Sequence, residues 1–265
     1  MDWTIWAGFA AGLLISVVTA PVGVSGAVFL LPVQLSVLSV LSVPSPAVTP
    51  TNLLFNVVAG PGALWRYRRD GALRGGLARR LVAWTLPGVI AGAAIRVFAL
   101  PGPDVFRILV ATLLLPVGTW LCLRTLSPAH EQPRPGTAEP SAAGLAVLAL
   151  SVGVVGGIYG IGGGSLLGPI LAARGMPLAH IAPATLATTF TTSVTGAAAY
   201  AVLATASTGP VEPDWWLGFA CGLGGLIGGY LGARLQPRLP ETALRLLLGT
   251  LAAALGALYA AQTLY

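Results

Sequence analysis

Charged side chains are scarce in this sequence. Only 8% of the 265 residues are charged and 55% are hydrophobic, with a mean hydropathy of +0.84. An ordinary soluble domain carries about 25% charged residues. The composition therefore excludes a soluble globular fold and predicts that the lipid bilayer surrounds most of the chain.

Cysteine is rare in the sequence, and the apolar segments contain almost no acidic side chains. Cys122 and Cys221 both lie within apolar runs, which excludes a disulfide framework and a cysteine-based metal site. All eight carboxylates lie in loops or at segment ends, so the apolar segments hold none of the carboxylates that mark proton relays and cation sites. We therefore expect neither a metal ion nor a cofactor.

Lysine is missing altogether, and all 14 basic residues are arginine. Six of them lie in one loop, residues 66–80, between apolar stretches. The positive-inside rule accounts for such a loop, so the net charge of +6 does not indicate a nucleic-acid partner. Arg96, Arg174 and Arg234 near segment ends are interpreted as arginines that snorkel to the interface, with attraction of an anion as the alternative.

Long apolar stretches dominate what is present. A helix of about 20 residues crosses the hydrocarbon core, and backbone in lipid must be helical unless it forms a closed barrel, whose alternating pattern is not seen here. The first stretch lacks the flanks of a signal peptide, so we expect it to remain in the protein. An all-α polytopic membrane protein is predicted, with apolar stretches at 5–20, 24–43, 48–64, 81–98, 105–123, 142–158, 181–204, 215–233 and 243–262, and a shorter one at 165–173.

The sequence also contains an internal repeat. The segment from Gly23 to Pro32 aligns with Gly160 to Pro169, and Arg107, Thr112 and Gly118 align at one further shift with Arg245, Thr250 and Gly256. We predict two homologous halves of four elements each, and a broken or hairpin helix opens each half. The first repeat covers 1–123, a polar proline-rich linker covers 124–141, and the second repeat covers 142–265.

Charge in equivalent loops predicts how the halves are related. Residues 66–80 are strongly basic, whereas the equivalent loop at 205–214 contains no arginine. Basic loops favour the cytoplasm, so these two loops should lie on opposite sides of the membrane. The halves are therefore expected to be inverted repeats, as in many secondary transporters.

A dense glycine block runs from Gly156 to Gly164. Each glycine costs about 1 kcal/mol relative to alanine within a helix, so an unwound turn is favoured, with a helix that restarts near Ser165. Free N–H groups at such a turn suit a small anion. The candidate residues are Gly160, Gly162, Gly163, Gly164 and Ser165. The alternative is that the glycines only allow helices to pack closely.

Hydroxyl groups crowd one apolar helix between Thr185 and Thr195. The repeat pairs this helix with Asn52 and Asn56, and one helical face is shared by Thr185, Thr188, Thr189, Thr192 and Ser193, of which Thr185, Thr188 and Thr189 are candidate site residues. Such a face could line a pathway, or its hydroxyls could bond to carbonyls of their own helix and of neighbouring helices. The repeat places Ser25 opposite Gly162, so Ser25 joins the candidate substrate-binding residues.

The residues around Ser25 also match a short catalytic motif. Gly23-Val24-Ser25-Gly26 spells the G-x-S-G of intramembrane serine proteases. A serine nucleophile needs a base, and both histidines, His130 and His180, lie in loops flanked by prolines. We therefore expect no enzymatic activity.

The glycine block with Pro169 downstream, followed by Pro177 and the threonine-rich helix, resembles the TauE/SafE family of sulfite exporters. The resemblance spans about 5–262 and implies a multi-pass transporter of the bacterial cytoplasmic (inner) membrane. Its substrate would be sulfite or an organosulfonate such as sulfoacetate. The first half departs from the pattern, because Gly23-Val24-Ser25-Gly26 lacks the triple glycine.

These observations lead to the hypothesis of an exporter of a small sulfur-containing oxyanion that works by alternating access. A passive anion channel and an accessory membrane protein without a substrate are the alternatives. The expected partners are the small anion and the lipid bilayer, and the G-x-x-x-G faces at Gly88–Gly92 and Gly228–Gly232 would suit a homodimer.

Overall fold

Every secondary-structure element in the described part of the chain is helical. The computed structural model describes residues 3–30, 48–74, 76–99, 103–127, 141–204 and 214–264. The long helices are α1 (Trp3–Thr19), α3 (Val48–Arg69), α4 (Gly76–Ala99), α5 (Pro103–Leu126), α6 (Ala142–Tyr159), α8 (Leu178–Ala204), α9 (Trp215–Leu235) and α10 (Glu241–Leu264). Shorter elements are α7 (Leu167–Ala173), η1 (Ala20–Val22), η2 (Ala72–Arg74) and η3 (Gln236–Arg238).

Six of these helices are long and apolar enough to cross a membrane: Trp3–Val22, Gly76–Ala99, Ala142–Tyr159, Leu178–Leu203, Trp215–Arg238 and Glu241–Gln262. The protein is therefore a multi-pass helical membrane protein. Three predicted segments lie mostly outside the described residues, namely the 24–43 stretch beyond residue 30, the linker at 124–141 and the loop at 205–214.

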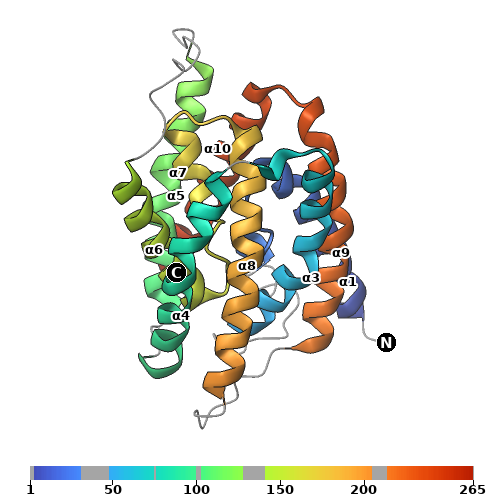
Figure 1. The fold of residues 1–265 in the computed structure, drawn as a ribbon, viewed down its shortest axis with the longest axis vertical. Helices are drawn as coiled ribbons and strands as arrows, with labels where there is room; N and C mark the ends of the chain where they lie inside the picture. Colours follow the sequence, from blue (N-terminus) through green and yellow to red (C-terminus); the bar gives the residue numbers. More distant parts are fainter. Residues whose placement is uncertain are drawn as a thin grey trace.

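Helix α8 lies between two groups of packed helices (Figure 1). On one side, α1 and α3 both pack against α9. On the other, α6 and α8 both pack against α4, while α5 and α10 form a pair of their own. The two sides are joined where α3 packs against α8.

Facing contacts define the helix directions. Along α1 and α9, Gly224 faces Phe9 and Gly232 faces Val17, so these helices run in the same direction. The residues that face each other along α3 and α9 show in the same way that these two helices are parallel. These three helices form the first parallel group.

The second parallel group consists of α4, α6 and α8. It runs opposite to the first, because Gly60 of α3 faces Phe190 of α8 while Gly196 of α8 faces Leu53 of α3. The end where α3 and α9 finish is therefore also the end where α4 and α8 begin.

Arginine gathers at that end, which we call the basic end. The element order places there the ends of α3, α5 and α9, and the starts of α4, α8 and α10. The opposite end holds Trp3, Trp215 and Trp216, each more than half exposed, as in an aromatic belt. The arginines of the basic end include Arg66, Arg68, Arg69, Arg79, Arg80, Arg124, Arg174, Arg234, Arg238 and Arg245.

Small residues allow the close approach between helices. A methyl group at Gly88 would lie 2.4 Å from the carbonyl oxygen of Leu150, and one at Gly228 would lie 2.2 Å from that of Leu13. Membrane helices use glycine in this way because close backbone contact replaces the hydrophobic driving force. The G-x-x-x-G faces thus pack within the chain, so a homodimer would need other surfaces.

A matched pair of substitutions in α9 tests this packing. A methyl group at Gly224 would lie 2.0 Å from the Phe9 carbonyl oxygen, whereas one at Gly229 would have its nearest contacts at 3.5 Å. Gly224→Ala should lower the stability of the detergent-solubilised protein by on the order of 1–3 kcal/mol. Gly229→Ala should stay within about 1 kcal/mol of wild type or gain slightly from helix propensity. Equal melting temperatures for the two variants would contradict this packing.

Candidate functional site

The glycine block breaks the chain between α6 and α7. Gly160 has φ +69° and Gly162 has φ +75°, values that side-chain-bearing residues rarely adopt. A methyl group at Gly160 would also lie 2.3 Å from the Thr49 carbonyl oxygen. The predicted unwound turn is therefore present at residues 160–166, which we call the second break.

One detail of the glycine prediction is corrected. Gly156 and Gly157 lie within α6 rather than in the turn, and Gly157 packs against the Val89 carbonyl. Close helix packing therefore explains Gly157, whereas the unwound turn explains the glycines from Gly160 onward. The next helix starts at Leu167, close to the predicted restart near Ser165, and has only seven residues. Ser165 donates its hydroxyl to the Ile161 carbonyl at 2.7 Å and closes the turn.

The first break lies at residues 23–26, after η1. Gly23 has φ +75°, and its carbonyl oxygen accepts a hydrogen bond from the Thr185 hydroxyl at 2.7 Å. The Ser25 hydroxyl oxygen accepts from the Ala27 N–H at 3.1 Å, which is the geometry of a helix N-cap. The opening helix is thus broken here too, although this segment lacks the triple glycine.

Asn56 of α3 connects the two breaks. Its side-chain oxygen accepts a short hydrogen bond from the Ser25 hydroxyl in the first break. Its amide nitrogen donates to the Gly160 carbonyl oxygen in the second break at 3.4 Å. One buried amide therefore holds together two segments that are distant in sequence.

The hydroxyls of α8 have different roles. Thr192 accepts a hydrogen bond from the Gly163 N–H at 2.9 Å and so supports the second break. Thr188, a predicted site residue, donates only to the Ala184 carbonyl of its own helix at 2.8 Å. The purely structural interpretation of this face therefore fits Thr188, while Thr192 was missed as a partner of the glycine turn.

Three buried polar side chains near the breaks have no hydrogen-bond partner among the described residues. They are both amide atoms of Asn52 and the hydroxyls of Thr189 and Ser193. A methyl group at Gly164 would lie 2.6 Å from the Thr189 hydroxyl oxygen, and one at Gly162 would lie 3.2 Å from that of Ser193. Buried polar groups are normally satisfied, so these three are candidates for contact with a ligand or with water.

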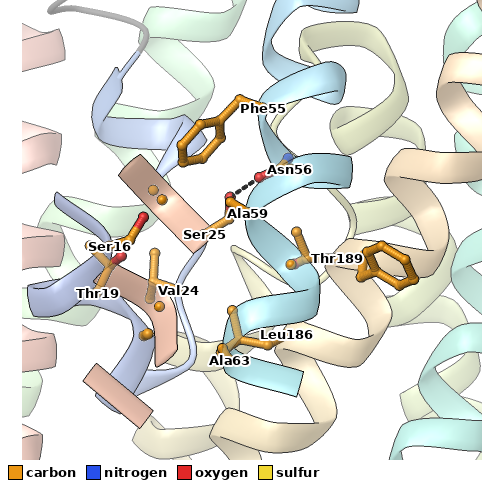
Figure 2. A pocket seen from close by; sticks show the side chains of 16 residues that line it. Ser16, Thr19, Val24, Ser25, Phe55, Asn56, Ala59, Ala63, Leu186 and Thr189 are labelled. Carbon is orange, nitrogen blue, oxygen red and sulfur yellow. Dashed lines mark hydrogen bonds between the residues drawn. The ribbon is translucent and has the colours of Figure 1, made fainter. Parts of the chain in front are cut away.

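A cavity of about 40 Å³ lies between the first break, α3, α8 and α9 (Figure 2). It has room for a few water molecules or one very small solute. Thr189, 4% exposed, faces it from α8 (Figure 2). Its polar side chains are Ser16, Thr19, Ser25, Asn56 and Thr189, and the remaining wall is apolar or glycine.

Only part of the predicted site lines this cavity. Ser25, Asn56 and Thr189 do, and the glycine turn adjoins them through Asn56 and Thr189. Asn52, Thr185 and Thr188 are buried but do not line it. Ser16 and Thr19 were missed, since isolated hydroxyls in an apolar helix are more often packing residues.

The interpretation of Arg96 as a snorkelling residue is wrong. Arg96 is only 8% exposed, inside the helix bundle. Neither it nor the other buried arginine, Arg245, lines the cavity.

Two interrupted helix elements are joined by Asn56, and an uncharged cavity lies beside the first of them, so the chain is a multi-pass membrane protein of the interrupted-helix type. Non-helical backbone is tolerated at membrane depth only where protein or a water-filled cavity surrounds it. The sequence model of the sulfite exporter TauE/SafE family matches residues 8–259, so the chain belongs to this family of membrane transporters. No curated protein and no solved structure matches the chain.

Asn52 and Asn56, one helical turn apart, provide a matched test of the link between the breaks. Asn56→Leu removes two buried hydrogen bonds and should cost about 1–3 kcal/mol, because it also leaves the Gly160 carbonyl without this donor. Asn52→Leu removes an amide without a partner and should leave stability unchanged or raise it.

Thermal unfolding in detergent measures both variants, with membrane insertion checked first. A larger loss for Asn52→Leu than for Asn56→Leu would show that Asn56 is not the link between the breaks.

Proposed function

We propose that the protein exports a small sulfur-containing oxyanion, with sulfite as the leading substrate, by alternating access. The observation that carries the proposal is the uncharged cavity at the first break, which is lined in part by Thr189, a buried residue whose hydroxyl has no partner among the described residues. Hydroxyl and amide groups donate hydrogen bonds to an oxyanion without carrying a charge that repels it. The family to which the chain belongs supports the sulfur oxyanion.

The size of the cavity favours sulfite over sulfoacetate. A volume of about 40 Å³ holds a few waters. Sulfite is a compact anion, whereas sulfoacetate adds a methylene and a carboxylate. Sulfoacetate would require the cavity to enlarge.

Matched hydrogen bonds support the prediction of a duplicated architecture. Tyr67 donates to the Ala20 carbonyl oxygen at 3.1 Å, and Tyr200 donates to that of Gly157 at 3.0 Å. The two tyrosines occupy equivalent positions in the predicted repeat when Asn56 is aligned with Thr189. The two acceptor residues occupy equivalent positions when the first break is aligned with the second. Each tyrosine thus holds the end of the helix that precedes a break.

Helix packing supports inversion of the halves. The contact of α1 with α9 has its counterpart in that of α6 with α4, and the contact of α3 with α9 has its counterpart in that of α8 with α4. In this alignment α1, α3 and α4 correspond to α6, α8 and α9, and each corresponding pair runs in opposite directions. Such halves can rock against each other so that a site between them opens to alternate sides.

The basic end is proposed to face the cytoplasm, as the positive-inside rule requires. The membrane potential, negative inside, would then drive a monovalent anion outward by about 2.3 kcal/mol per 100 mV. Export by a voltage-driven uniporter follows from this orientation.

Efflux of radiolabelled sulfite from proteoliposomes tests the proposal. We expect saturable, voltage-sensitive flux. Thr189→Val should raise the KM for sulfite about tenfold, the effect of losing one hydrogen bond to an anion, without lowering the melting temperature. Thr188→Val is the matched control and should leave KM unchanged, because this hydroxyl bonds only within its helix.

The alternatives give different outcomes in the same assay. A passive anion channel would conduct without saturation, and an accessory protein without a substrate would give no flux above empty liposomes. Equal KM values for wild type and Thr189→Val would remove Thr189 from the site.

Cysteine labelling tests the inverted architecture. In a background with Cys122→Ala and Cys221→Ala, a membrane-impermeant maleimide should label Trp216→Cys in intact cells. It should label Arg79→Cys only after lysis, because Arg79 lies at the basic end and Trp216 at the opposite end. Labelling of both positions from the same side would contradict the orientation.

A further inference from the structure

The cavity at the first break is uncharged, although it is proposed to hold an anion. Its polar groups are the four hydroxyls of Ser16, Thr19, Ser25 and Thr189 and the Asn56 amide. Among the described residues that line it there is no arginine, histidine or carboxylate. Because these groups carry no charge, they determine which anion charges the cavity can stabilise.

The charged groups on the surrounding helices lie near helix ends, and none of them is among the described residues that line the cavity. They are Arg66, Arg68 and Arg69 on α3, His180 on α8, and Asp214 and Arg234 at the two ends of α9, while α1 contributes none in its described residues. The other titratable side chains on these helices, Tyr67, Tyr200, Cys221 and Tyr230, are also absent from the lining.

The buried arginines do not supply the missing charge. Arg245 donates to the Ala172 carbonyl at 3.1 Å and the Met176 carbonyl at 3.1 Å, and it forms an ion pair with Glu241 at 3.0 Å. Arg96 lies outside the cavity lining as well. A bound anion would therefore be held by neutral dipoles alone.

Neutral dipoles discriminate strongly between anions of different charge. The cost of moving an ion out of water grows with the square of its charge, so a dianion pays about four times the penalty of a monoanion of the same size. Hydrogen bonds from hydroxyls and an amide offset only part of this desolvation free energy, because each group contributes one hydrogen bond.

The hydrogen-bonding capacity of the cavity points the same way. A hydroxyl such as that of Thr189 can both donate and accept, and it has no partner among the described residues. A fully ionised oxyanion only accepts hydrogen bonds. A protonated oxyanion also donates one, so it can satisfy hydroxyls in both senses.

We infer that the site accepts singly charged oxyanions and rejects dianions of the same size, so that hydrogensulfite rather than sulfite is the transported species. This inference rests on the proposed function. The second pKa of sulfurous acid lies close to neutrality, so the transported fraction changes within the physiological pH range. Sulfate, a dianion throughout this range, should be a poor ligand.

The test measures the KM for radiolabelled sulfite in proteoliposomes from pH 6 to pH 9, with the same pH on both sides and the voltage clamped. Above the second pKa, the KM in total sulfite should rise about tenfold per pH unit, since the monoanion fraction falls by that factor. The KM expressed as hydrogensulfite should stay constant. Methanesulfonate, a permanent monoanion, should compete with an inhibition constant independent of pH, which separates titration of the substrate from titration of the protein.

The contrary outcomes are distinct. A KM in total sulfite that stays flat or falls as pH rises would overturn the inference and leave the exporter proposal intact. Failure of methanesulfonate to compete at any pH, or competition by sulfate at concentrations similar to methanesulfonate, would also overturn it. Absence of saturable sulfite flux at every pH would instead overturn the exporter proposal, and the inference with it.

Discussion

The amide of Asn56 is the interaction on which the centre of the structure depends. A helix that breaks inside a membrane exposes N–H and carbonyl groups that lipid cannot satisfy. Asn56 accepts from the Ser25 hydroxyl of the first break and donates to the Gly160 carbonyl of the second. Only a side chain that both donates and accepts can join the two, and a primary amide does so without introducing charge.

Around this link, further groups satisfy the broken backbone from both sides. Thr185 binds the Gly23 carbonyl and Thr192 binds the Gly163 N–H, so α8 supports both breaks. Tyr67 and Tyr200 hold the helix ends that precede them. The threonine-rich face is therefore mainly a scaffold, and Thr189 differs from its neighbours because it lines the cavity and its hydroxyl has no partner among the described residues.

The separation of charge from the cavity gives this architecture its proposed function. Arginines gather at the basic end, and the buried Arg245 is paired with Glu241 and with carbonyls near the end of α7. The cavity keeps only neutral dipoles. In the proposed function, such a site would hold a small anion by hydrogen bonds alone, so its selectivity would depend most on the charge of the ligand.

The sequence by itself determined the membrane class, the helical content and the turn at Gly160, because hydropathy, the constraint of backbone in lipid and glycine density act locally. It also singled out Asn56, Ser25 and Thr189. It could not distinguish Thr188 from Thr189, or predict that Arg96 is buried and that Ser16 and Thr19 line a cavity. Only the tertiary structure decided these points, because whether a polar side chain is satisfied depends on which backbone groups other helices bring within hydrogen-bonding distance.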